Sequence, residues 1–196
     1  MLIVIAVISA LAGGILYSSL FEWTLHKFVM HRPILGFRYP FKAHALTHHR
    51  IFSWDATYLL QRDEDLSNVT FAWWNFPALL GINAVFVGGV ALAIAGGLNA
   101  YFWTIGPVAL GVLAAYYFTY EYLHFCMHVR TGRWFENTAW FRFIDDHHRM
   151  HHRNPRSNLN VVLPLADFLL RTKAPGLAPV YRLAAEARRD SILSGR

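Results

Sequence analysis

Charged residues and cysteine are both scarce in this chain. Charged residues make up 15% of its 196 positions and hydrophobic residues 55%, whereas a soluble domain has roughly 25% charged residues. The single cysteine, Cys126, excludes an internal disulfide framework and a metal site built from cysteines. With so little charge available to cover a surface, the apolar residues are expected to face something other than water.

Two long segments contain no charged residue at all. They are residues 2–21 and residues 71–120. About twenty apolar residues cross the roughly 30 Å hydrocarbon core of a bilayer, so the first segment predicts one span and the second predicts two. The second segment is expected to turn at residues 96–99, Gly-Gly-Leu-Asn. The predicted spans are about 2–24, 71–95 and 100–123.

The N-terminal apolar run is expected to stay in the protein as a span. A secretory signal peptide carries a basic segment before its apolar core and a small-residue cleavage site after it. Here no Lys or Arg precedes Lys27, and the run continues into Phe21-Glu22-Trp23. We therefore predict three spans and a single domain over residues 1–196.

The basic residues indicate how the chain crosses the membrane. None lies in the N-terminal run or in the predicted turn; six lie at 27–62 and twelve at 130–196. The positive-inside rule places the N-terminus outside and the segments 26–62 and 124–172 in the cytoplasm. The net charge of +6 favours anionic lipid headgroups. A nucleic-acid partner is not expected, because no soluble basic domain remains to bind it.

Eleven histidines form four clusters, all on the predicted cytoplasmic side. Side chains three or four apart on a helix share one face, so each cluster can direct imidazoles at one point. If ten of the eleven histidines are ligands, they are too many for one metal ion but suit two ions with about five ligands each. The clusters are His26 and His31; His44, His48 and His49; His124 and His128; and His147, His148, His151 and His152.

The last cluster offers one histidine more than the site needs. On a helix, His148, His151 and His152 spread over about 100°, and exchanging His148 for His147 widens the spread to about 140°. This favours His148 as the ligand and His147 as its neighbour.

Histidine ligands alone do not determine which metal is bound or which activity the protein has. Neutral imidazole suits iron, zinc, copper and nickel, and chemistry with dioxygen would select iron. A transition-metal transporter or other metal-binding membrane protein is the rival interpretation. Transporters place ionisable ligands near the middle of the bilayer, and the centres of the predicted spans hold no Asp, Glu, His or Lys. The sequence therefore favours an enzyme.

The order of the histidine boxes resembles the fatty acid hydroxylase / sterol desaturase superfamily. It runs His-x4-His, His-x3-His-His, a membrane hairpin, His-x3-His and His-x2-His-His. Residues 25–33 (LHKFVMHRP) are similar to the first box of that superfamily, and residues 153–160 and 164–172 to the segment after its last box. The chain departs from the pattern at Ala166 and at Leu170-Arg171, where the superfamily more often has Trp and Phe-Gly.

The resemblance implies a non-haem di-iron oxygenase. Such an enzyme uses dioxygen and two external electrons to hydroxylate an unactivated C–H bond of a lipid, which would be fatty acyl, sterol-like or carotenoid. Desaturation on the same site is the alternative, and zinc can replace iron in purified protein. Electrons are expected from a separate donor, either a ferredoxin or a cytochrome with its reductase.

The resemblance also carries over the site residues by position. Ligating imidazoles usually donate their second N–H to a carboxylate or carbonyl, which makes nearby polar residues candidates for supporting the ligands. Asp146 could instead cap the last histidine helix, and Asp167 could pair with Arg171. The implied metal ligands are His26, His31, His44, His48, His49, His124, His128, His148, His151 and His152, and the candidate supporting residues are His147, Glu121, Asp146, Asn158 and Asp167.

The expected fold is therefore an all-α integral membrane protein with three spans and a cytoplasmic helical cap around a dinuclear site. An apolar substrate channel is expected between residues 71–76 and 116–125. Residues 51–57 are a candidate lid or a membrane-surface anchor, and residues 179–196 a surface helix.

Overall fold

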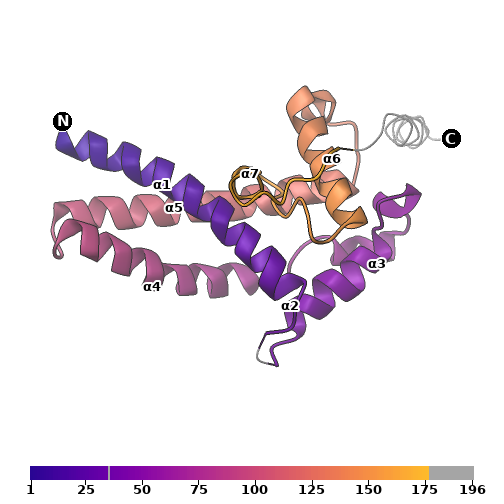
Figure 1. Cartoon of the computed structure of the whole chain (residues 1–196), viewed down its shortest axis with the longest axis horizontal. Coiled ribbons are helices and arrows are strands. Elements are labelled where there is room, and N and C mark those ends of the chain that lie inside the picture. Colours follow the sequence, from indigo (N-terminus) through magenta and orange to yellow (C-terminus); the bar gives the residue numbers. More distant parts are fainter. Residues whose placement is uncertain (35, 177–196) are drawn as a thin grey trace.

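The computed structural model describes residues 1–34 and 36–176. Within this part of the chain, helices are the only regular secondary structure. Three of them are long and apolar enough to cross a membrane: α1 (Leu2–Leu25), which continues as a helix to Met30, α4 (Asn75–Ala95) and α5 (Ala100–His128). They run along one half of the molecule, with the N-terminus and the α4–α5 turn at the same end (Figure 1). The predicted C-terminal surface helix lies outside the described residues.

The turn between α4 and α5 forms where the sequence predicts it. Gly96 ends α4 with a positive φ of 67°, a conformation that glycine adopts without steric cost. Asn99 then caps α5, because its Oδ1 accepts the backbone N–H groups of Tyr101 and Phe102. Local turn chemistry thus sets the hairpin.

The two hairpin helices differ from the predicted bounds at their other ends. The helix α4 begins at Asn75 rather than at Phe71, whose N–H instead donates to the Glu121 carboxylate at 3.1 Å. The helix α5 continues beyond residue 123 to His128. His124 and His128 therefore lie on the last turns of a membrane-length helix.

The three long helices are tied together within the apolar region. The helix α1 packs tightly against α5 at Gly14, where a Cβ atom would lie 3.1 Å from the Cβ of Val112. Small residues of this kind let helix backbones approach in membranes. The Tyr17 hydroxyl donates to Asn83, which is fully buried, and joins α1 to α4.

Most of the short elements form a cap at the opposite end from the N-terminus, whereas α7 (Leu165–Leu169) packs against α1 nearer the middle of the molecule (Figure 1). The core of the cap is apolar and includes Tyr58, Met127, Phe141 and Ile144. Thr138 caps the longest cap helix by accepting the N–H of Phe141 at 3.2 Å, so Asp146 does not fill that position. In chain order the elements are η1 (His26–Met30), α2 (Tyr39–Phe41), η2 (Lys42–His48), α3 (His49–Ile51), η3 (Ala56–Tyr58), η4 (Asp63–Asn68), η5 (Trp134–Asn137), α6 (Ala139–Arg153) and α7 (Leu165–Leu169).

Candidate metal centre

Ten of the eleven histidines meet in two groups of five. Within each group, one imidazole nitrogen from every member lies within 4.8 Å of all the others, and no other such group with three or more members occurs in residues 1–34 and 36–176. The first histidine group is His26, His31, His44, His49 and His151; the second histidine group is His48, His124, His128, His148 and His152.

Wide helical turns build the first group. η1 and η2 are π-helical, with backbone bonds from residue i+5 to residue i; the His31 N–H, for example, donates to the His26 carbonyl at 3.1 Å. In such a turn, side chains five residues apart lie much closer around the axis than the about 140° of an α-helix. The rings of His26 and His31 have centroids 5.2 Å apart, and those of His44 and His49 4.7 Å apart.

Ordinary α-helical spacing builds most of the second group. His124 and His128 are four apart on α5, and His148 and His152 are four apart on α6. The neighbouring His151 lies about 100° around the α6 axis and joins the first group instead. One helix thus supplies both groups, and the groups do not follow the sequence clusters.

Backbone carbonyls orient six of the ten imidazoles. The Nδ1 atoms of His48, His124, His128 and His151 lie 2.7–2.9 Å from the carbonyls of Asn68, Val69, Tyr58 and Ser157. His26 and His152 make the same contact with Leu159 and Phe52. Since a carbonyl only accepts, Nδ1 carries the hydrogen, and Nε2 keeps a lone pair directed into the group.

The second group cannot be satisfied by hydrogen bonds alone. His48, His124, His128 and His152 all present Nε2 lone pairs, and among the described residues the Nε2 atoms of His48 and His124 have no hydrogen-bond partner. His148 Nε2 carries one hydrogen at most, yet it faces His128 Nε2 at 3.2 Å and His152 Nε2 at 2.9 Å. A cation would satisfy all five nitrogens together.

The nitrogen spacings also match a shared cation. Neighbouring Nε2 atoms of the first group lie 2.8–3.1 Å apart. Two nitrogens bound at about 2.1 Å and at a right angle around one transition-metal ion lie about 3.0 Å apart. Each group therefore fits a transition-metal ion both in donor type and in spacing.

Burial keeps the cap imidazoles neutral. It lowers the pKa of His31 and of His48 to about 4 and that of His151 to about 3, because a charged imidazole loses its hydration there. For His44, the neighbouring histidines add to the same effect and lower its pKa well below 6.5. Neutral imidazole is the form that binds metal, so these side chains are ready to act as ligands at neutral pH.

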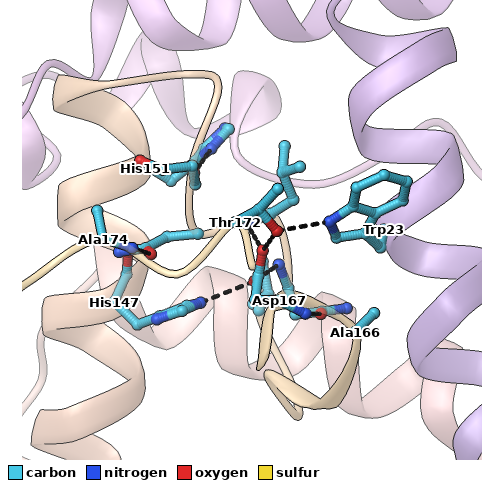
Figure 2. Close-up of polar contacts among 12 residues, drawn as sticks. Trp23, His147, His151, Ala166, Asp167, Thr172 and Ala174 are labelled. Carbon is cyan, nitrogen blue, oxygen red and sulfur yellow. Dashed lines mark hydrogen bonds and ion pairs between the residues drawn. The ribbon is translucent and has the colours of Figure 1, made fainter. Parts of the chain in front are cut away.

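His147 lies outside both groups and points away from them. Its Nε2 donates to Asp167 at 2.9 Å, as Figure 2 shows, while His148 takes the place in the second group. Asp167 also accepts the Thr172 hydroxyl at 2.6 Å and the backbone N–H groups of Leu159 and Asn160. Burial alone would raise the pKa of Asp167, but these hydrogen bonds outweigh it and the pKa is lowered. Asp167 thus links His147 to the 157–172 segment, and its partners among the described residues are these groups rather than Arg171.

The other candidate supporting residues, Asn158, Glu121 and Asp146, have different surroundings. Asn158, at a positive φ of 56°, donates to the His147 carbonyl at 3.1 Å and holds the chain beside His151. Glu121 accepts from the Phe71 N–H and so ties the segment that precedes α4 to α5, whereas Asp146 is half-buried on α6. The direct supports of the imidazoles are carbonyl groups, which leave no mark in a sequence.

Glu22 is a functional candidate that the sequence reasoning missed. It is buried on the last turn of α1 and accepts from the Tyr116 hydroxyl at 2.6 Å, from Asn160 Nδ2 at 2.9 Å and from Val161 N–H at 2.6 Å. Beside it, Trp23 Nε1 donates to Thr172 (Figure 2). In the sequence, Glu22 is the first charged residue after the N-terminal apolar run. That position could have indicated this contact between α1 and the 157–172 segment.

An apolar pocket lies between α1, α4 and α5. Its lining includes Phe71, Phe76, Tyr116 and Tyr120, which belong to the segments predicted to line a channel, and it also includes His26 of the first histidine group. The candidate lid, residues 51–57, does not line this pocket; its Phe52 is buried, and the Phe52 carbonyl accepts from His152. The pocket thus borders one histidine of the candidate metal centre.

Comparisons of the chain with protein-family models, with curated proteins and with solved structures give no match.

Proposed function

We propose that this chain is a membrane-bound non-haem di-iron oxygenase that hydroxylates an unactivated C–H bond of a lipid. The observation that carries the proposal is the pair of histidine groups, each with five imidazoles around one point at spacings that suit a transition metal. The resemblance of the histidine boxes to the fatty acid hydroxylase / sterol desaturase superfamily supports the same assignment.

The two groups would each hold one iron ion through Nε2 atoms. Bound iron supplies the reduction of dioxygen and the oxidation of a C–H bond, with one oxygen atom delivered to the lipid and the other released as water. The protein contributes orientation, because the carbonyl contacts of His48, His124 and His128 fix the direction of each ring.

The apolar pocket supports a lipid as the substrate. Its lining comes mostly from the three membrane-length helices and includes His26 and Tyr120, whose ring stacks on His124 with centroids 5.5 Å apart. A lipid chain in this pocket would therefore lie against His26 of the first group and against Tyr120, the neighbour of His124. Apolar walls also exclude water from the reacting C–H bond.

The two electrons are proposed to come from a separate ferredoxin or from a cytochrome with its reductase. Purified protein should then form product only when such a donor is added. Turnover with a nicotinamide cofactor alone would refute this part of the proposal.

The first test is the metal content of detergent-purified protein. We expect about two ions per chain, iron among them, and the loss of about one ion in each of His48→Ala and His151→Ala, which remove a ligand from different groups. His147→Ala is the matched control and should keep both ions. Absence of stoichiometric metal in the wild type would overturn the di-metal proposal.

The second test separates an oxygenase from a metal transporter. Isotopically labelled dioxygen should place one labelled atom in the lipid product, and the two metal-ligand variants should lose this activity. Metal flux across proteoliposomes without oxygen consumption would instead favour transport.

A further inference from the structure

The apolar pocket contains two hydroxyl groups that the fold leaves unpaired. Ser18 Oγ on α1 and Tyr120 OH on α5 belong to its lining, and among the described residues neither has a hydrogen-bond partner. Their exposed fractions are only 1% and 7%, so bulk water does not satisfy them. A buried hydroxyl without a partner costs free energy, which a ligand with a suitable polar atom would recover.

The acidic group in the pocket lining is already occupied. Glu22 also lines the pocket, but its carboxylate accepts from Tyr116, Asn160 and Val161. Glu22 therefore serves the contact with the 157–172 segment. The two hydroxyls remain as the polar groups in this apolar pocket that are available to a ligand.

We propose that the pocket binds a lipid that carries an oxygen atom, either a hydroxyl or a carbonyl, within its apolar part, and that Ser18 and Tyr120 donate hydrogen bonds to that oxygen. A plain hydrocarbon chain would fill the pocket but leave both hydroxyls unpaired. This inference names the substrate class of the proposed oxygenase and rests on that function for the statement that the bound lipid reacts.

The two hydroxyls also relate the oxygen to the reaction site. Tyr120 precedes His124 by four residues, an axial rise of about 6 Å on α5, and Ser18 precedes His26 by eight, or about 12 Å on α1. The bound oxygen would therefore lie one to two helical turns from the histidine groups. The C–H bond that reacts would belong to the part of the lipid between the oxygen and the histidines.

The test is equilibrium binding of three probes to the full chain in detergent micelles. The probes are a long-chain alkane, the corresponding mid-chain alcohol and the corresponding ketone, each radiolabelled and corrected for uptake by empty micelles. Two added hydrogen bonds predict that the alcohol and the ketone bind about tenfold more tightly than the alkane.

Two variants remove only the hydroxyl groups. Ser18→Ala and Tyr120→Phe should each reduce the preference to about threefold, and the double variant should bind all three probes alike. Ser9→Ala and Tyr122→Phe are matched controls on the same helices, because both side chains are exposed. They should keep the full preference.

Either of two results would overturn the inference: equal binding of alkane and ketone by the wild type, or an undiminished preference in the double variant. Binding needs neither metal nor turnover, so the result is independent of the proposed function. If the wild type preferred the alcohol and the ketone but held no metal, the pocket assignment would stand and the proposed oxygenase would be refuted. If it held two metal ions and oxygenated lipid but showed no such preference, the oxygenase would stand and the pocket assignment would be refuted.

Discussion

At the scale of single residues, adjacent histidines have different partners because one residue step turns a helix by about 100°. His147 faces Asp167 and ties α6 to the 157–172 segment, whereas His148 faces the lone pairs of the second group. The same step separates His151 from His152, which belong to different groups. The presence of a histidine in such a cluster therefore does not by itself show whether it is a metal ligand or a structural residue.

Replacing each of the first two histidines of α6 tests this difference. His148→Ala should lose about one metal ion per chain, because it opens the second group. His147→Ala should keep both ions but lower the free energy of unfolding by roughly 1–3 kcal/mol, since buried Asp167 loses a donor. Metal analysis and thermal unfolding in detergent distinguish the two. Equal metal loss in both variants would contradict these roles.

At the scale of elements, the π-helical turns decide which histidines meet. An α-helix would place residues five apart about 140° away from each other, so His26 and His31 would not share a ligand point. The wide turns reduce that offset in both η1 and η2. The first group is therefore sensitive to chain length within these turns.

Adding one residue to η1 tests this requirement. An alanine inserted after Val29 should place His26 and His31 six positions apart, on different sides of the helix, and should release about one ion per chain with the second group retained. Val29→Ala keeps the chain length and should keep both ions. If the insertion variant purified with two ions, the spacing within the wide turn would not be needed for metal binding.

Local signals in the sequence were sufficient for part of this architecture. The apolar runs predicted three membrane-length helices, and Gly96 with Asn99 predicted the turn between two of them. The ten histidines could be selected because their clustering is visible along the chain. Their division between two groups could not, because it depends on π-helical turns that no propensity marks and on carbonyls such as that of Leu159, contributed by a distant segment.

At the scale of the whole molecule, the histidine groups join the spans to the cap. The second group draws ligands from α5, from η2 and from α6, and the first from η1, η2, α3 and α6. Metal bound to these groups would hold together segments that are far apart in the chain. Binding to the folded state alone stabilises it, by about 4 kcal/mol at a thousandfold excess over Kd.

Metal removal should therefore loosen the cap more than the spans. After chelation we expect a lower thermal midpoint and faster tryptic cleavage at the exposed Arg50 and Arg62, with the spans left intact in detergent. Adding iron or zinc back should restore protection. If chelation removed the ions and cleavage stayed slow, the cap would not depend on them.

The orientation of the molecule in the membrane can be tested by cysteine labelling, because the native chain has a single cysteine. Cys126 is completely buried, so cysteines introduced at exposed sites should react over a low background. The distribution of basic residues predicts that Leu98→Cys, at the turn between α4 and α5, reacts with a membrane-impermeant maleimide on intact cells. Arg156→Cys, beside the histidine groups, should react only after the cells are permeabilised. The reverse pattern would place the candidate metal centre outside the cell and would exclude a cytoplasmic electron donor.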